Sequence, residues 1–264
     1  MRKLIMTSLT LNTSDGFVLS VDYEKVEEST QVVIFAHGMT VNMDDEGIFV
    51  KAARKLKDLH ISTIRFDFRA HGKSTGKSEI DFTISGELID LDTIMKFVQD
   101  EGYKKIGLAG ASFGGGISAL YAGEHATDID ALVLANPALD YKKCFLNPTT
   151  TWAREHFSDL DDRLSKDGMI KIGSRQFGAG AKLFEEMKEY FPHRKLSAYN
   201  KPLLIVHGTK DSKVAYDDAY EVYQQLDNPL KRFETIDGSE HGFHGEQYEN
   251  RVTRMIADFF KEQL

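Results

Sequence analysis

One pentapeptide in the sequence has the residue types of a nucleophilic catalyst. Residues 110–114 read Gly-Ala-Ser-Phe-Gly, a G-x-S-x-G pattern with Ser112 at its centre. It lies between an apolar run, 106–109, and a segment of helical character that begins at Gly115. A serine presented on a sharp strand-to-helix turn needs this setting, with small residues on either side so that strand and helix can approach closely. The alternative is a glycine-rich turn that carries an incidental serine.

An aspartate and a histidine follow two later apolar runs and could activate this serine. A serine hydroxyl is a weak nucleophile until a base takes its proton, and the base needs an acid to orient it. Asp211 follows the run 203–206, and His241 follows the run 232–236. Parallel strands bring residues at their ends to the carboxyl edge of a sheet, where Ser112 also lies. We therefore expect Ser112, His241 and Asp211 to form a catalytic triad.

Other histidines and acids compete for these two roles. His244 lies three residues after His241 and is the alternative base, although the Glu-His-Gly-Phe setting favours His241. Asp217 and Asp218 are expected in the first turn of a helix, where carboxylates complement the helix dipole. His207 ends an apolar run and is expected to be buried and hydrogen-bonded rather than catalytic.

Two backbone N–H groups are expected to form an oxyanion hole, because the negative oxygen of a tetrahedral intermediate needs at least two aimed donors. One donor should be Phe113, directly after the serine. The other should be Met39, which follows His37-Gly38 after the apolar run 32–36. Gly38 lets the chain fold back, and Met39 would contribute its N–H whatever its side chain. His37 itself is expected to be a packed loop histidine.

Composition and spacing argue against several other functions. The 33 lysines and arginines against 41 aspartates and glutamates give a net charge of −8, which disfavours nucleic-acid and membrane partners. The single cysteine, Cys144, allows no internal disulfide and no cysteine-cluster zinc site. His241 and His244 lack a third ligand at zinc-like spacing. The segment 73–78 resembles a P-loop, but His71 occupies the position of its first glycine. We expect no cofactor and no metal.

The elements that must position these residues are visible as alternating apolar and amphipathic segments. Short runs rich in β-branched residues alternate with stretches of helical period, which predicts an α/β fold with a mostly parallel eight-stranded sheet and helices on both faces. The predicted strands are 4–11, 17–23, 32–35, 61–66, 106–109, 131–135, 203–206 and 232–236. The first two flank Ser14-Asp15-Gly16 as a β-hairpin.

One long stretch interrupts this alternation. After Asn136-Pro137, the next convincing strand begins only near 202, which is too far for a single crossover helix. We expect a core formed by 1–137 and 198–264, with 138–197 as an inserted helical lid. The alternative is a helical excursion that only completes the core. The stretch carries eight aromatic residues: Tyr141, Phe145, Trp152, Phe157, Phe177, Phe184, Tyr190 and Phe191.

The opening residues bear on localisation. Residues 1–6 begin like a signal peptide, but Thr7 and Ser8 interrupt the apolar run. Apolar stretches elsewhere fall short of the 18 or so residues that span a membrane. We therefore expect a cytoplasmic protein, and we leave open whether it forms a homodimer.

Five motifs give the chain a resemblance to the α/β-hydrolase superfamily, over essentially its whole length. They are HG (37–38), RFDFRAHGKS (65–74), GASFGG (110–115), HGTKD (207–211) and SEHGF (239–243). Within the superfamily, the chain is most similar to bacterial cinnamoyl (feruloyl) esterases. The resemblance implies Ser112 as the nucleophile, His241 as the base and Asp211 as the orienting acid. It also implies Met39 and Phe113 as the oxyanion donors.

Two positions depart from the pattern of that branch. Cinnamoyl esterases commonly read His-Gly-Phe where Met39 follows Gly38 here, so the wall of the acyl pocket is expected to differ. Ala70 stands where a glycine usually precedes the second His-Gly. Around it, Asp67, Arg69 and His71 are expected to form a hydrogen-bonded structural turn rather than to act in catalysis.

These observations predict a serine carboxylic-ester hydrolase that works through an acyl-enzyme. The expected partner is a small-molecule ester with a small aromatic or short acyl group, of the hydroxycinnamoyl type. A monoacylglycerol lipase, a thioesterase and a C–C bond hydrolase would use the same triad. Outside the enzymes, the fold could serve as a non-catalytic small-ligand-binding protein.

Overall fold

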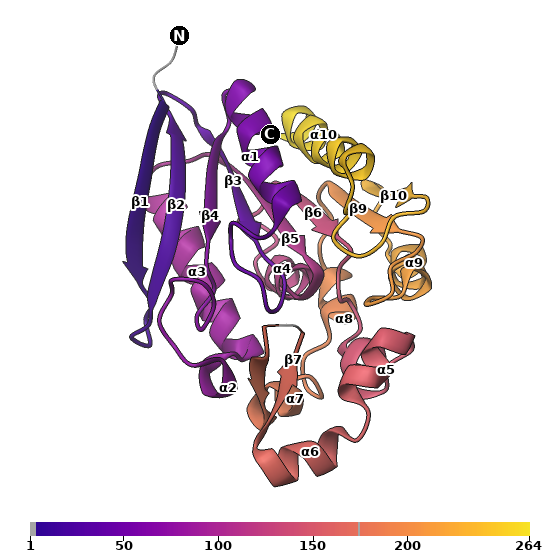
Figure 1. Cartoon of the computed structure of the whole chain (residues 1–264). Helices are drawn as coiled ribbons and strands as arrows, with labels where there is room; N and C mark the ends of the chain where they lie inside the picture. The colour runs from indigo at the N-terminus through magenta and orange to yellow at the C-terminus, as the bar shows by residue number, and fades with distance from the viewer. Residues whose placement is uncertain (1–3, 174) are drawn as a thin grey trace.

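A computed structural model describes residues 4–173 and 175–264, and its central feature is an eight-stranded sheet (Figure 1). The strand order is β1-β2-β4-β3-β5-β6-β9-β10. Pairing is antiparallel between β1, β2 and β4 and parallel from β4 onward, so the predicted fold class is confirmed. The first three residues, which bear on the signal-peptide question, lie outside the described residues. The strands are β1 (Leu4–Asn12), β2 (Val18–Val26), β3 (Gln31–Ala36), β4 (Ser62–Phe66), β5 (Lys105–Ala111), β6 (Ala131–Ala135), β9 (Leu203–Gly208) and β10 (Lys231–Ile236).

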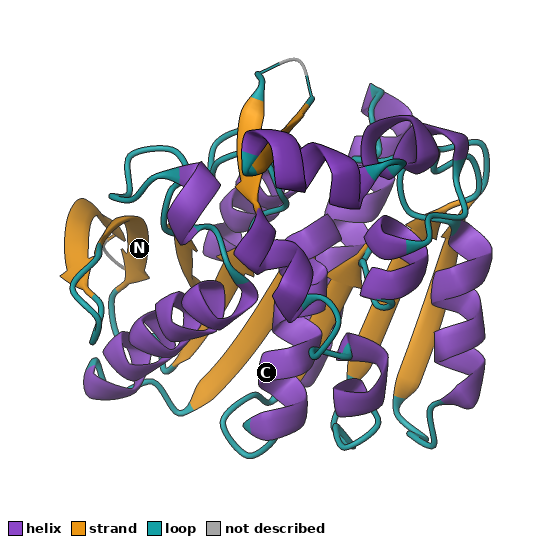
Figure 2. Cartoon of the chain, turned by 90° about the horizontal axis from the view of Figure 1, so that it is seen from below, coloured by secondary structure: helices purple, strands orange, loops and turns teal. Residues whose placement is uncertain are grey.

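Helices cover both faces of this sheet, as Figure 2 shows. Because neighbouring residues of a strand point to opposite faces, each central strand contributes to two apolar clusters. Val33 of β3 packs with α1 and α10, whereas Ile34 packs with α3 and α4. This explains why the strands are apolar throughout rather than alternating. The helices outside the insert are α1 (Gly47–Asp58), α2 (Ser78–Asp81), α3 (Ile84–Asp100), α4 (Ser112–Glu124), α9 (Tyr216–Gln225) and α10 (Glu246–Gln263).

The register of the parallel strands brings their carboxyl ends level with one another. Ala36 of β3 pairs with Gly110 of β5, and Ala111 pairs with Ala135 of β6. At the other side of the sheet, Gly208 of β9 pairs with Ile236 of β10. The loops that carry the predicted site residues therefore all leave the sheet at one edge.

The segment between β6 and β9 differs in part from the expected helical insertion. It contains a short antiparallel hairpin as well as helices. Its second strand reads Phe-Gly-Ala-Gly, and its first, Met-Ile-Lys-Ile, is only four residues long, so neither gives a strong strand signal in the sequence. The elements are the π-helical turn η1 (Lys142–Leu146), α5 (Thr151–Phe157), α6 (Leu160–Asp167), β7 (Met169–Ile172), β8 (Phe177–Gly180), α7 (Ala181–Glu186) and α8 (Pro192–Leu196).

The insert lies on the side of the molecule where the loop after β3 also emerges (Figure 1). Its last helix, α8, packs closely on α4, since a Cβ atom added at Gly123 would lie 2.1 Å from the carbonyl oxygen of Lys195. None of the helices in the described ranges is both long enough and apolar enough to cross a membrane.

Candidate active site

Ser112 lies on a strained turn between β5 and α4. Its φ angle is +52°, a region that residues with a side chain seldom adopt. The neighbouring glycines are required by close packing. A Cβ atom at Gly110 would lie 2.3 Å from Ser118 Oγ, and one at Gly114 would lie 2.1 Å from the carbonyl oxygen of His37. The turn therefore has the geometry that the G-x-S-x-G pattern predicts, with a half-exposed serine at its tip.

The structure brings the three predicted catalytic residues into one chain of contacts. Ser112 Oγ lies 3.0 Å from His241 Nε2, and His241 Nδ1 lies 2.7 Å from Asp211 Oδ2. His241 follows β10 and precedes Gly242, whose φ of +83° turns the chain back toward the sheet. A hydroxyl, an imidazole and a carboxylate in this order can transfer a proton away from the hydroxyl.

Asp211 is buried, and both of its carboxylate oxygens accept hydrogen bonds. Its Oδ1 accepts the backbone N–H groups of Lys213 and Val214, both at 2.9 Å. Its Oδ2 lies 3.2 Å from His207 Nε2 as well as near His241. Burial works to raise the pKa of Asp211, but attraction to His241 and the hydrogen bonds from both histidines outweigh it and hold the pKa below its usual value. The carboxyl is therefore an anion at neutral pH.

The competing residues take other places. His244 is exposed, and among the described residues it makes no hydrogen bond to Ser112 or Asp211. Asp217 and Asp218 lie in the first turn of α9, as expected. His207 is buried and hydrogen-bonded to the carbonyl oxygen of Val214, as expected, but its contact with Asp211 was not foreseen.

The loop after β3 passes directly against the serine. A Cβ atom at Gly38 would lie 3.0 Å from Ser112 Cβ, so a side chain there would crowd the serine. His37 is buried, and its Nε2 accepts the backbone N–H of Phe68, which fixes the loop. Met39 is half-buried in the same loop. Phe113 is the second residue of α4, where a backbone N–H has no partner inside the helix.

Three consecutive acids in the same loop have three different partners, and sequence reasoning missed all of them. Asp44 accepts from Arg65 of β4 at 2.8 Å. Asp45 forms a two-pronged ion pair with Arg175 in the β7–β8 turn of the insert, with one contact at 3.0 Å. Their partners lie 21 and 130 residues away, so the local sequence gives no signal for them. The third acid, Glu46, accepts the backbone N–H of Gly38 at 3.3 Å.

A network of buried polar side chains fixes the loops next to the site by hydrogen bonds. Asp67 accepts the backbone N–H groups of Met43 and Lys73, both at 2.8 Å. Arg69 forms two hydrogen bonds to Asp90. These contacts confirm the expected structural turn. Burial lowers the pKa of the neighbouring His71 to about 3, so its imidazole is neutral.

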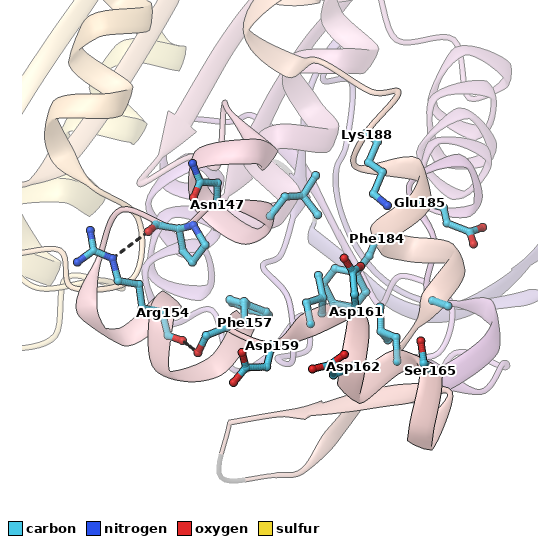
Figure 3. Close-up of a pocket in the computed structure, with 16 residues that line it drawn as sticks. Asn147, Arg154, Phe157, Asp159, Asp161, Asp162, Ser165, Phe184, Glu185 and Lys188 are labelled. Carbon is cyan, nitrogen blue, oxygen red and sulfur yellow. Dashed lines mark hydrogen bonds between the residues drawn. The ribbon is translucent and has the colours of Figure 1, made fainter.

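Aromatic rings connect the serine's neighbour to the insert. Phe113 stacks on Tyr141, with ring centroids 5.3 Å apart, and contacts Phe145 at 6.0 Å. Phe145 in turn meets Phe157 of α5 edge-to-face at 5.3 Å. Phe157 lines a cavity of about 990 Å³ among α5, α6 and α7, where Phe184, Arg154 and several acids also lie (Figure 3).

Within residues 4–173 and 175–264, no group of three or more histidine, cysteine, aspartate or glutamate side chains is arranged to hold an ion.

Comparison with known proteins agrees with this architecture. Residues 27–175, more than half of the chain, match the family model Hydrolase_4, described as "Serine aminopeptidase, S33". Mouse "Monoglyceride lipase" is 27% identical over 261 residues, covering 89% of this chain and 84% of that protein. "Monoacylglycerol lipase abhd6-A" of Xenopus laevis is 25% identical over 204 residues and 76% of this chain, which spans only 54% of that relative's length.

Among solved structures, Est1E from Butyrivibrio proteoclasticus with bound ferulic acid superposes with a TM-score of 0.81 at 22% identity. The match covers 97% of this chain and 99% of that one. Likeness at this level of identity establishes the shared fold alone, whereas the family model that matches residues 27–175 confirms the predicted superfamily.

Proposed function

Because the chain belongs to the Hydrolase_4 family of α/β hydrolases, we propose that it is a serine carboxylic-ester hydrolase with Ser112 as its nucleophile. The observation that carries this proposal is the contact chain from Ser112 Oγ through His241 to Asp211, at 3.0 and 2.7 Å. The strained turn that presents the serine supports the same assignment.

The proposed mechanism follows from these contacts. Ser112 Oγ attacks the acyl carbon while His241 Nε2 takes its proton. Asp211 accepts the Nδ1–H of His241, which keeps Nε2 free to accept a proton and stabilises the imidazolium. The backbone N–H groups of Met39 and Phe113 donate to the oxyanion. His241 then gives the proton to the leaving alcohol, and water hydrolyses the acyl-enzyme.

For the substrate, we propose esters with a small aromatic or short acyl group. The motifs shared with cinnamoyl esterases support this, as does the structural neighbour with bound ferulic acid. The rings of Phe113 and Tyr141 are buried and stack on each other, so they hold the insert against the helix that begins at the serine and do not themselves face a substrate. We further propose that the insert 138–197 forms the wall over this side of the site.

A monoacylglycerol is the second candidate substrate. Two relatives at 25 and 27% identity are named monoacylglycerol or monoglyceride lipases. The cavity of about 990 Å³ in the insert has none of Ser112, His241 and Asp211 in its lining, so its size does not favour either candidate.

A substrate panel separates these candidates. Wild type and Ser112→Ala would be assayed with p-nitrophenyl butyrate, methyl ferulate, a long-chain monoacylglycerol, an acyl thioester and an aminoacyl p-nitroanilide. We expect turnover of the first two by wild type and none by Ser112→Ala. Fastest turnover of the monoacylglycerol would favour the second candidate. Fastest turnover of the thioester or of the anilide would indicate a different acyl-transfer reaction. Failure of wild type to take up one equivalent of a fluorophosphonate would refute the nucleophile.

We also propose a cytoplasmic location, since the single cysteine, Cys144, cannot form an internal disulfide and so gives no reason to place the chain in an oxidising compartment. Fractionation of cells that express the untagged chain tests it.

A further inference from the structure

Glu46 shares a small cavity with the two residues that would carry the reaction. The cavity lies beside Ser112 and His241, and its other walls come from the ends of β5 and β6 and from the loop after β10. Its volume is about 10 Å³, which is room for one water molecule.

The carboxyl of Glu46 is fixed at this cavity and has one oxygen to spare. Oε2 accepts the backbone N–H of Gly38, which holds the side chain beside the serine. Within the described ranges this is the only hydrogen bond of the Glu46 side chain, so Oε1 is left to bind a water. The residue is half-buried, and burial raises the pKa of its carboxyl.

The apolar residues that line the cavity limit which groups can form hydrogen bonds to a water there. Ile48 and Phe243 are buried and their side chains offer no hydrogen bond, and the Oδ1 of Asn136 already accepts the backbone N–H of Gly208. The remaining polar side chains that face a water there are those of Glu46, Ser112 and His241. A buried water needs two to four polar partners, and these three groups supply them. Of these, Ser112 would carry the acyl group and His241 would act as the general base.

We propose that Glu46 is a positioning residue that holds the water for hydrolysis of the acyl-enzyme. The inference rests on the proposed function, because it requires an acyl group on Ser112. The water's oxygen forms a bond to the acyl carbon while His241 Nε2 takes one of its protons. Glu46 Oε1 accepts the other O–H throughout. The bond from the acyl carbon to Ser112 Oγ then breaks, Oγ regains the proton from His241, and the carboxylic acid leaves.

Kinetics distinguish this role from a structural one, because the water is needed only in the second half of the reaction. For Glu46→Ala with p-nitrophenyl acetate, we expect a burst of p-nitrophenol at the wild-type rate. The steady-state rate after the burst should fall by about tenfold or more. Since kcat/KM reports acylation alone, kcat and KM should fall together and kcat/KM should stay within about twofold of wild type.

Two further variants complete the test. In Glu46→Gln the single amide oxygen stays on the Gly38 N–H, so the NH₂ group faces the water and cannot accept its O–H; this variant should hold the loop, keep the burst and recover little of the steady-state rate. Asp44→Ala removes the neighbouring acid that pairs with Arg65 and should leave both phases unchanged. Circular dichroism shows whether each variant is folded.

Three results would overturn the inference. An equal slowing of the burst and the steady state in Glu46→Ala would mean that Glu46 holds the Gly38 loop for acylation instead. Unchanged kinetics in both phases would mean that it holds no water that reacts. Full recovery of the steady-state rate in Glu46→Gln would contradict the role of Oε1 as an acceptor for the water. Turnover that persists in Ser112→Ala is a separate result, which removes the proposed function itself.

Discussion

Replacing Asp211 with asparagine tests the proposed transfer of a proton from Ser112 to His241, because Asp211 orients the imidazole and its own hydrogen bonds are fixed by the backbone. Oδ1 of Asp211 accepts two backbone N–H groups, from Lys213 and Val214. In Asp211→Asn, the amide oxygen takes that place, because an NH₂ group there would face two fixed backbone donors. On the other side the NH₂ group meets one donor, His207 Nε2, which keeps the carbonyl oxygen of Val214 as its acceptor. The NH₂ group must then point toward His241 Nδ1. That nitrogen becomes an acceptor, so the imidazole proton moves to Nε2.

The expected loss of activity is large because Nε2 faces Ser112 Oγ at 3.0 Å. With a proton on Nε2, the imidazole donates to the hydroxyl and cannot accept its proton. A wrong tautomer of this kind lowers kcat by about 10⁴-fold in an enzyme with the same triad, trypsin, which is roughly 5 kcal/mol of transition-state stabilisation. We expect a loss of about that size here.

The assay is steady-state hydrolysis of p-nitrophenyl butyrate, with thermal unfolding measured in parallel. Asp218→Asn is the matched control, since Asp218 lies on α9 and pairs with Lys143 instead of a histidine. It should retain wild-type kcat. Both variants must unfold cooperatively above the assay temperature for the comparison to count.

A kcat for Asp211→Asn within about tenfold of wild type would refute the reasoning, because the forced amide orientation permits no other tautomer. A loss of similar size in Asp218→Asn would instead point to Asp218 as the orienting acid, and the contact geometry at Asp211 would then be irrelevant to catalysis.

Two further predictions concern stability. Gly114→Ala should lower the free energy of unfolding in urea by about 3 kcal/mol, because the new Cβ would lie 2.1 Å from the backbone oxygen of His37; a change below about 1 kcal/mol would contradict the packing argument. Burial raises the pKa of Glu87 well above its usual value, so its carboxyl is protonated in the fold where the unfolded chain has lost the proton, and stability falls as pH rises above about 4.3. Glu87→Gln should flatten that fall, which is at most about 1.4 kcal/mol per pH unit; an unchanged slope of thermal stability between about pH 5 and pH 8 would show that Glu87 is not its source.

The sheet could be predicted from the sequence because its strands are buried on both faces. A run such as residues 131–135 is apolar at every position, and no competing element explains it. The turn at Ser112 could also be predicted, because the G-x-S-x-G pattern places glycines at 110 and 114. In the structure both positions require glycine, since an added Cβ atom would lie closer to neighbouring atoms than van der Waals contact allows. Local sequence and tertiary packing agree at these positions.

The insert and the acids of the β3–α1 loop were harder to predict for a different reason. The β7–β8 hairpin has strands of four residues, too short for a period of two to stand out. Glu46 resembles its neighbours Asp44 and Asp45 in sequence, and only the fold of the loop turns it toward Gly38 and the serine. Such contacts depend on the path of the backbone and leave no periodic signal.

The stack of Phe113 on Tyr141, continued through Phe145, limits how this protein can admit substrates. An aromatic ring that loses its buried contacts exposes roughly 150–250 Å² of surface, a penalty of about 4–6 kcal/mol. An insert that swung away as a hinged flap would separate these rings from the residue next to the nucleophile. Directed evolution of acyl preference should therefore succeed by resizing side chains within a fixed wall, whereas transplanting a foreign insert would disturb the nucleophile's own helix.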